Sequence, residues 1–176
     1  CTVKVVHSET KEKQWNYKLH IAMAPTKNID RFEWFLEKST EIGIDEITPI
    51  LCEHSERKVI KMDRLARILE AAMKQSLKFR LPKLNNLTSF SKFIETNTND
   101  NLFIAHCENT DKENLKEILK PRQNTTILIG PEGDFSTYEI ETALKSSYQP
   151  ISLGESRLRT ETAGIVAAQT ISFINQ

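Results

Sequence analysis

The spacing of hydrophobic and polar residues switches repeatedly between the two-residue period of β-strands and the longer period of α-helices. Residues 1–24 alternate as two strands, one around residues 3–5 and one over residues 15–23, on either side of a polar turn at residues 7–13. Over residues 29–42 the apolar positions follow the helical period instead, which predicts the first helix.

Capping residues mark where some of these helices should begin and end. Asp30, with Glu33 three positions later, is the predicted N-cap of the first helix, and Gly43 suits its C-terminal end. Thr110 and Glu113 have capping-box spacing and predict another helix. The remaining predicted elements are a strand at 46–52, a helix with an apolar face from Met62 to Leu77, a short helix at 89–96, a strand at 102–106, a strand at 126–129, a helix at 137–147, a strand at 150–153 and a helix at 161–174.

Strands that alternate with helices indicate an α/β fold, with a mostly parallel sheet and helices on both faces. Pro49 favours an edge position for the strand at 46–52, because proline cannot donate a ladder hydrogen bond. At 176 residues the chain has room for one domain and a small appendage.

The turn after the strand at 126–129 contains two glycines. Gly130 and Gly133 permit backbone conformations that are closed to residues with a Cβ, and Pro131 stiffens the turn between them. Such a turn can hold the polar edges of a small ligand, and an ordinary strand–helix connection is the alternative.

A helix should begin directly after this turn. Ser136 and Glu139 have capping-box spacing, and Phe135 and Ile140 can form the hydrophobic staple that fixes the entry angle of the helix. The strand, turn and helix N-terminus therefore form one compact unit.

A second polar loop, residues 153–163, follows the strand at 150–153. It contains Arg157, Arg159 and a Glu–Thr pair immediately before a helix that starts with small residues. Either arginine alone would be expected to form a surface salt bridge. We expect the two loops to leave the C-terminal ends of neighbouring strands, where ligands bind in open α/β sheets, so a shared functional site is the better interpretation.

Charge and cysteine content narrow the class of protein. The 24 basic and 24 acidic residues cancel, but residues 53–92 hold ten Lys or Arg against four acidic residues. This basic stretch is either a solvated helix face or a surface that contacts phosphates. The three cysteines and four histidines have neither disulfide-framework nor metal-ligand spacing, and there is no apolar run long enough for a membrane span, so a cytoplasmic protein without metal is expected.

Several motifs are absent from the sequence. It contains no GxxxxGK[ST], no GxGxxG after the first strand and no GxSxG, which argues against a P-loop NTPase, a dinucleotide enzyme and an α/β-hydrolase.

The two loops together carry a resemblance to a known family. IGPEGDFS at 129–136 followed by LGESRLRTETA at 153–163 resembles the SPOUT (α/β-knot) RNA methyltransferases, and within them the RsmE type, which methylates N3 of a uridine in small-subunit (16S) ribosomal RNA. Further matches occur in order upstream, at Lys27, 38–43, 47–49, 54–57, 71–72, 75–76 and Pro82. Asp134 departs from a usual glycine, and Lys78 stands near the position where an arginine is usual after Gln-Ser, which keeps the charge but loses the planar fork.

The resemblance implies a fold and partners that the spacing does not reveal. It implies that S-adenosylmethionine binds in a deep C-terminal trefoil knot, that the protein is a homodimer whose site is completed by the second subunit, and that ribosomal RNA is the substrate. It also implies a division into residues 1–18, the remnant of an N-terminal PUA-like β-barrel RNA-binding domain, and residues 19–176, the methyltransferase domain.

The same resemblance suggests roles for individual residues. The residues expected to bind the cofactor are Ile129, Gly130, Pro131, Glu132, Gly133, Leu153, Gly154, Leu158, Thr160, Thr162 and Ala163. Those expected to contact RNA are Lys27, Lys38, Arg57, Gln75 and Lys78, for which a solvated basic surface is the alternative. Arg159 or Arg157 is the candidate for stabilising the uridine anion, and Glu161, or else Glu132, is the candidate base.

Two other functions remain open at this level. The chain could be a knotted RNA-binding module without catalysis, although the presence of Arg159 and Glu161 argues against this. It could also be a SPOUT methyltransferase that acts on another RNA, such as tRNA.

Overall fold

A computed structural model describes residues 2–10, 13, 15–96, 101–108 and 110–176 of the chain. The strands are β1 (Leu19–Met23), β2 (Glu46–Leu51), β3 (Lys83–Leu84), β4 (Thr88–Ser89), β5 (Asn101–Ala105), β6 (Glu113–Asn114), β7 (Thr125–Ile129) and β8 (Gln149–Ser152). The helices are α1 (Ile29–Ile42), α2 (Met62–Gln75), α3 (Phe90–Thr96), α4 (Leu115–Ile118), α5 (Thr137–Lys145) and α6 (Thr160–Ile174).

The strands form one sheet in the order β3-β2-β1-β7-β5-β8-β6, with β4 also pairing with β2. All pairings among the described strands are parallel. β1 and β7 lie side by side in the middle of the sheet, and every residue of both is buried. Such continuous burial is expected where helices cover both faces of a parallel sheet.

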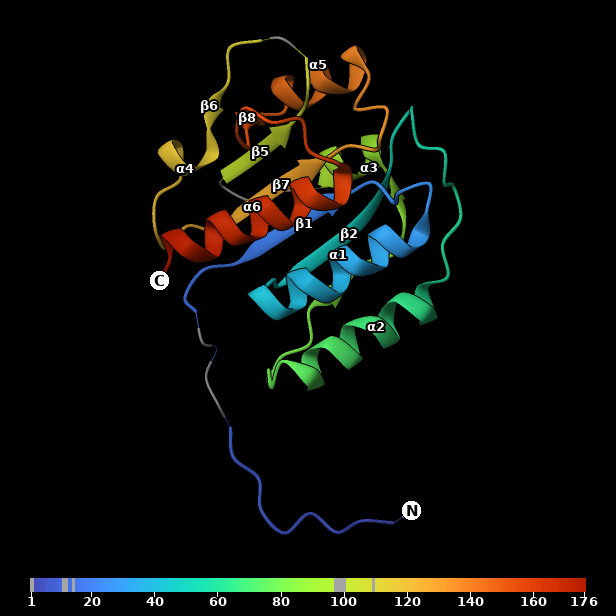
Figure 1. Cartoon of the computed structure of the whole chain (residues 1–176), viewed down its shortest axis with the longest axis vertical. Helices are drawn as coiled ribbons and strands as arrows, with labels where there is room; N and C mark the ends of the chain where they lie inside the picture. The colour runs from blue at the N-terminus through green and yellow to red at the C-terminus, as the bar shows by residue number, and fades with distance from the viewer. Residues whose placement is uncertain (1, 11–12, 14, 97–100, 109) are drawn as a thin grey trace.

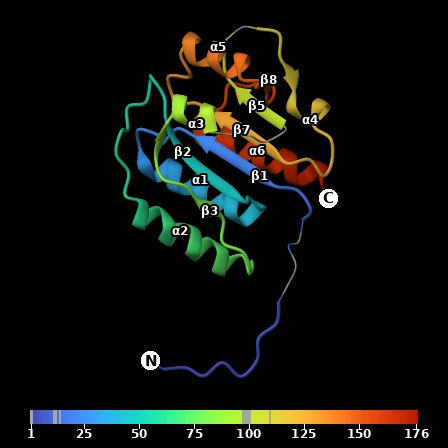
Figure 2. The same cartoon turned by 180° about the vertical axis from the view of Figure 1, so that it is seen from behind.

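The helices divide between the two faces. Figure 1 shows α1, α2 and α6 in front of the sheet, and Figure 2 shows α3 and α5 on the other side. Each face has its own apolar cluster, one centred on Phe32, Phe35 and Leu36 of α1 and the other containing Phe90 and Phe93 of α3. The predicted α/β fold with helices on both faces is therefore confirmed.

The N-terminal segment differs from the prediction. Residues 2–10 form no strand and run away from the sheet (Figure 1), and residues 15–17 form a bend before β1. Residues 11–12 of the predicted turn lie outside the described residues. Trp15 instead packs on Gly43 and donates a hydrogen bond to Asp45 Oδ2 (3.2 Å), so the alternation read there reflects packing onto the domain.

Two predicted helix caps were wrong. The N-cap of α1 is Asn28, whose side chain accepts from the amide of Asp30 (3.2 Å), so the helix begins earlier than predicted. After Thr110 the chain forms the short strand β6, and Asn114 caps α4. The capping box of Ser136 and Glu139 in α5 is confirmed, as is the C-terminal role of Gly43.

Pro49 and Leu77 also depart from the predictions. β2 is not an edge strand: it pairs with β1 on one side and with β3 and β4 on the other. Pro49 lies between the stretches that pair with β3 and with β4, where its missing N–H removes no bond on that side. Leu77 follows α2 with φ 54° and is 78% exposed, so it does not extend the apolar face of that helix.

The strand ends place the loops that matter for function. Ile129 of β7 is level with Ala105 of β5, and Ala105 is level with Ile151 of β8. Because these strands are parallel, the segments that follow them leave the same edge of the sheet. The trefoil knot stays a prediction. Among the described helices, none is both long enough and apolar enough to cross a bilayer.

Candidate functional site

Three loops meet at the C-terminal edge of the central strands. The glycine loop follows β7 (residues 130–136), the arginine loop follows β8 (residues 153–159), and the β5 loop (described residues 106–108 and 110–112) lies between them. The expectation that the glycine and arginine loops leave neighbouring strands was wrong, because β5 separates β7 from β8. The β5 loop is therefore the middle wall of the site.

Two adjoining cavities lie among these loops. The first, of about 430 Å³, is lined by the β5 loop and the arginine loop, including His106, Lys112 and Gly154. The second, of about 300 Å³, is lined by the glycine loop and the start of α6. Both cavities are bordered by Ala105, Cys107, Arg157, Leu158 and Ala163. The two loops identified from the sequence thus border a single region, and its size falls within the range of small-molecule sites.

Most of the residues expected to bind a cofactor line these cavities. Those lining the second cavity are Ile129, Gly130, Pro131, Glu132 and Thr160; those lining the first are Leu153 and Gly154; and Leu158 and Ala163 line both. Gly133 and Thr162 line neither.

Close packing shapes the glycine loop. A Cβ on Gly130 would lie 3.1 Å from the Phe135 ring, and a Cβ on Gly133 would lie 3.0 Å from His54 Cβ. Gly154 in the arginine loop has φ 126°, a conformation that L side chains rarely adopt, with open space around it. The glycines of both loops are therefore required by the backbone path and its neighbours.

Asp134 takes a left-handed conformation in the glycine loop, with φ 64°. Its carboxylate accepts hydrogen bonds from the amide of Cys107 (2.6 Å) and from its neighbour Phe135 (2.8 Å). Aspartate tolerates this backbone region better than most residues, so the departure from glycine noted in the sequence is sterically acceptable here.

The β5 loop contributes a histidine, a cysteine and a lysine. His106 is 8% exposed, and burial together with Lys112 lowers the pKa of its imidazole, so the ring is neutral near pH 7. Burial and the nearby Asp134 raise the pKa of the Cys107 thiol, so Cys107 is not a thiolate nucleophile. Lys112 Nζ donates to the carbonyls of His106 (2.8 Å) and Glu108 (2.6 Å), which closes the loop on itself.

The two arginines line the cavities, whereas the two candidate carboxylates, Glu132 and Glu161, lie in different cavities. Arg157 lines both cavities, and Arg159, at the N-cap position of α6, lines the second together with Glu132. Glu161 does not join them. It lines a third cavity of about 300 Å³ with Asp30, Arg31, Trp34 and Thr162, and its Oε1 lies 3.8 Å from Arg31 Nε.

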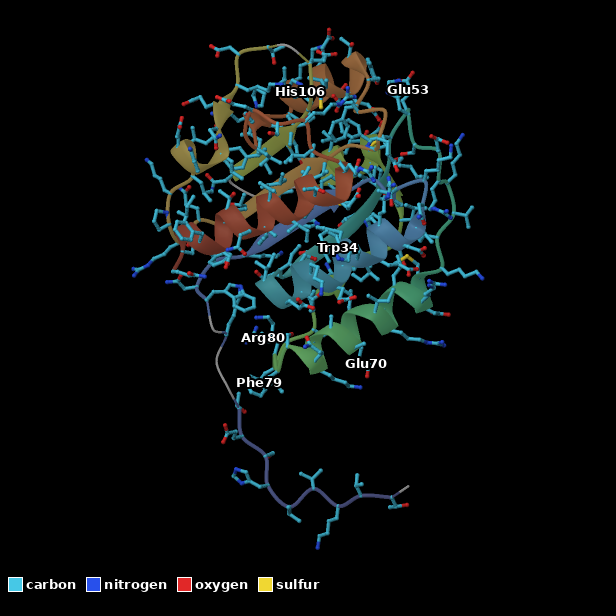
Figure 3. The ribbon with its side chains drawn as sticks, in the orientation of Figure 1. Trp34, Glu53, Glu70, Phe79, Arg80 and His106 are labelled. Carbon is cyan, nitrogen blue, oxygen red and sulfur yellow. The ribbon has the colours of Figure 1, made fainter. Side chains whose placement is uncertain are left out.

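Of the five residues expected to contact RNA, Lys38 lies on α1 and the other four fall into two groups. Lys27 and Arg57 lie beside the glycine loop: the Lys27 amide donates to Glu132 Oε1 (2.9 Å), and Arg57 Nε donates to the Thr26 carbonyl (3.0 Å). The second group lies toward the other end of the domain. Figure 3 shows Phe79 and Arg80 at the end opposite to His106, and Gln75 and Lys78 are their close neighbours in the chain.

All four basic side chains among these five residues already have a partner, and Gln75 is uncharged. Lys27 pairs with Glu56 (2.7 Å), and this hydrogen bond raises the pKa of Lys27. Lys38 pairs with Glu37 (2.7 Å) and Glu41 (2.9 Å), and the Lys78 amino group lies 5.2 Å from the centre of the Trp15 ring.

Sequence reasoning missed the β5 loop entirely. Its residues His106, Cys107 and Lys112 line the first cavity, and Cys107 also borders the second. Asp134 of the glycine loop, which lines the second cavity, was not among the predicted site residues either. The available signal was the strand predicted at 102–106, because a parallel strand must end at the edge where the other loops lie. Among the described residues, no group of three or more His, Cys, Asp or Glu side chains could hold a metal ion.

Comparisons with known proteins agree with this geometry. The family model described as "RNA methyltransferase domain" matches residues 13–172. A relative from Mesomycoplasma hyopneumoniae, named ribosomal RNA small subunit methyltransferase E, is 34% identical over 152 residues, which is 84% of this chain and 65% of the relative. The chain therefore spans less than two thirds of that relative's length.

Solved structures show the same fold. A protein from Porphyromonas gingivalis, described as a probable rRNA-methyltransferase, has a TM-score of 0.90 at 45% identity and matches 95% of this chain and 71% of its own. A Legionella pneumophila protein solved with bound S-adenosylmethionine has a TM-score of 0.84 at 28% identity, covering 91% and 67% of the two chains. On the family match and these relatives together, the chain belongs to the RNA methyltransferase domain family.

Proposed function

We propose that this chain is the methyltransferase part of an enzyme that transfers a methyl group from S-adenosylmethionine to N3 of a uridine in small-subunit ribosomal RNA. The observation that carries the proposal is the pair of adjoining cavities that both characteristic loops border, with Arg157, Leu158 and Ala163 shared. The names of the relatives support ribosomal RNA as the substrate, and the bound cofactor of the Legionella protein supports S-adenosylmethionine.

The lining of the cavities suits this cofactor. Apolar side chains such as Ile129 and Leu158 can cover its uncharged parts, while backbone groups of the two glycine-bearing loops can meet the polar edges. Lys112 and Arg157 supply positive charge to the first cavity, which suits a carboxylate group. When bound, S-adenosylmethionine supplies an electrophilic methyl group.

The chain itself must deal with the proton on N3 of the uridine. Arg159 and Arg157 can place positive charge beside the anion that forms across O2, N3 and O4. Of the two candidate bases, Glu132 shares a cavity with Arg159, whereas Glu161 lies in the third cavity beside Arg31. The geometry therefore favours Glu132 as the proton acceptor and leaves Glu161 with a role in orienting Arg31.

The wider assembly forms part of the same proposal. Lys27 and Arg57, beside the glycine loop, are positioned to meet RNA that enters the site, whereas Gln75 and Lys78 are chain neighbours of Phe79 and Arg80 at the opposite end of the domain. A homodimer would allow the second group to act on the site of the other subunit. Residues 1–18 are proposed to lead into an RNA-binding domain, and the cytoplasm, where ribosomes assemble, is the proposed location.

Nucleoside mass spectrometry of ribosomal RNA tests the substrate. RNA from cells that lack the gene should have lost N3-methyluridine from the small subunit, and the purified protein with S-adenosylmethionine should restore it. Unchanged N3-methyluridine in those cells would overturn the substrate assignment. Methylation of tRNA alone would favour another RNA substrate, and cofactor binding without any transfer would favour a non-catalytic module.

A further inference from the structure

Asp134 stands in a conformation that favours glycine, yet it carries a side chain with two structural partners. Its φ of 64° lies in the left-handed region, which glycine adopts without steric cost. The backbone turn does not require the carboxylate, since the Asp134 amide already donates to the Pro131 carbonyl (2.9 Å). The contacts of the side chain must therefore explain what it does.

The carboxylate bridges two loops. Oδ2 accepts from the Cys107 amide at 2.6 Å, across 27 positions of sequence, and Oδ1 accepts from the Phe135 amide at 2.8 Å. Phe135 is buried, so one end of this bridge is fixed in the core beneath the glycine loop. Hydrogen bonds to an ionised acceptor are shorter and stronger than neutral ones, which fits the short contact to Cys107.

The glycine loop is held firmly on its other side. His54 Nδ1 lies 3.0 Å from the Gly133 carbonyl and 3.1 Å from the Asp134 carbonyl, so the loop following β2 braces the turn from behind. The turn can therefore act as a fixed support from which Asp134 holds the Cys107 amide.

The described residues of the β5 loop make further contacts, within the loop and with the start of α5. Lys112 closes it on itself, and the Thr137 hydroxyl contacts Glu108 Oε1 (2.8 Å) further along the loop. Cys107, which borders both cavities, is held through its amide by Asp134. The Asp134 carboxylate thus links this shared wall to the glycine loop.

We propose that Asp134 is a positioning residue that couples the glycine loop to the β5 loop and so sets the wall between the two cavities. This inference rests on the proposed function, because it assigns the wall to the S-adenosylmethionine site. Asp134 is not expected to take part in the chemistry. It acts through the Cys107 amide.

Two substitutions distinguish the effect of the Asp134 carboxylate from that of the left-handed backbone. Asp134→Gly removes the carboxylate and keeps the left-handed backbone, whereas Asp134→Asn keeps an oxygen that can accept from Cys107 and also tolerates this backbone. Calorimetric titration with S-adenosylmethionine should show affinity weakened about tenfold in Asp134→Gly and by no more than about threefold in Asp134→Asn, because a neutral acceptor restores part of the contact. The KM for S-adenosylmethionine should rise accordingly, with kcat changed less.

Hydrogen exchange of the Cys107 amide gives a readout that does not need the cofactor. The exchange should be slow in the unsubstituted protein, fast in Asp134→Gly and intermediate in Asp134→Asn. Ser147→Gly is the matched control, because Ser147 also has a left-handed backbone (φ 67°) but follows α5, away from both cavities. It should leave both the affinity and the exchange of Cys107 unchanged.

The possible failures can be told apart. Unaltered affinity and unaltered Cys107 exchange in a folded Asp134→Gly protein would overturn the inference, as would an equal loss in Asp134→Asn and Asp134→Gly. Failure of the unsubstituted protein to bind S-adenosylmethionine would contradict the proposed function instead, and the exchange rates of Cys107 would still decide whether Asp134 holds the β5 loop.

Discussion

In the proposed mechanism, Arg159 at the second cavity stabilises the uridine anion. Arg159 is exposed and lines the cavity from the N-terminus of α6, so its removal should leave the fold intact. We predict that Arg159→Ala lowers the rate of methyl transfer by about 10²–10³-fold, as the loss of a group that stabilises a developing anion does. Affinity for S-adenosylmethionine should stay within a few-fold of the unsubstituted protein.

Methyl transfer to small ribosomal subunits, measured with a labelled cofactor, checks this prediction. Arg67→Ala is the matched control, because Arg67 is also exposed but lies on α2. The control should transfer methyl groups normally. Full activity of Arg159→Ala would remove this arginine from the proposed mechanism.

A buried histidine makes stability depend on pH. His20 is 5% exposed and lies 2.7 Å from the Thr48 hydroxyl, and burial lowers its pKa to about 4. In the unfolded chain an ordinary histidine has a pKa near ~6.5. Between these values the unfolded chain binds a proton that the folded protein does not, so stability is full above this window and falls as the pH falls through it, by on the order of 3 kcal/mol.

Urea unfolding at several pH values measures this slope. We expect His20→Gln to flatten most of it between pH 6.5 and 4 while keeping a polar contact to Thr48. His106, whose pKa is also lowered, should account for what remains. Burial raises the pKa of Glu46, but hydrogen bonds from Asn85, Lys18 and Lys83 outweigh it and lower this pKa to about 2. Because Glu46 of the folded protein therefore titrates below the window, the slope should persist in Glu46→Gln. A pH-independent stability from 7 to 4 would contradict the account.

For single residues, the sequence predicted which residues line the cavities better than it predicted their side-chain contacts. Glycine and arginine positions in the two loops could be predicted from spacing and from the family resemblance, and most of them line the cavities. The side to which Glu161 points could not be predicted, because it depends on how α6 packs against α1 near Arg31. The contact from Asp134 to Cys107 was equally hidden, since it joins residues 27 positions apart.

Among the elements, α6 depends on close approach to α1 and β1. A Cβ on Gly164 would lie 2.7 Å from the Phe35 ring and 3.1 Å from Met23 Sδ. Alanine is ordinarily favoured over glycine inside a helix by about 1 kcal/mol. We predict that Gly164→Ala is nevertheless destabilising, by about 1–3 kcal/mol, because the core must shift to admit the methyl group.

Thermal unfolding decides the sign of this change. Gln169→Ala, an exposed position on the same helix, is the control and should leave the protein as stable as before or slightly more so. A stabilised Gly164→Ala protein would show that the helix can move away from Phe35 at little cost.

Elements with strong periodicity were predicted almost in full. Helices α1, α2, α5 and α6 and strands β5, β7 and β8 appear within a few residues of the predicted ranges. The errors lie where local signals compete. Asn28 caps α1 in place of Asp30, and a two-residue strand replaces the start of the helix predicted after Thr110, because sheet pairing with β8 competes with helix capping there.

For the whole molecule, the order of the strands in the sheet determines which loops line the site. The insertion of β5 between β7 and β8 brings a third loop to the cavities, and nothing in the local sequence specifies that order. Long-range pairing is set by the competition of all strands for buried positions. The fold class could therefore be predicted from alternating periods, whereas the composition of the site wall could not.

The cofactor should couple to the stability of the entire domain. Because the cavities are formed by loops from three strands, the unfolded chain cannot reproduce them. We predict that S-adenosylmethionine at ~100 times its dissociation constant stabilises the folded protein by about 2.7 kcal/mol. Thermal unfolding with and without the cofactor measures this, with adenosine as the comparison ligand. An identical unfolding temperature at saturating cofactor would contradict specific binding to the folded state.

The central claim is that one region, bordered by both glycine-bearing loops, binds S-adenosylmethionine. Calorimetric titration of the unsubstituted chain and of Ala163→Phe tests it most directly, because Ala163 lines both cavities and a phenyl ring would fill the space between them. Ala71→Phe, at an exposed position of α2, serves as the control. We predict one binding site per chain, retained in the control and weakened at least about a hundredfold in Ala163→Phe. No binding to the unsubstituted chain, or equal binding to a folded Ala163→Phe protein, would contradict the account.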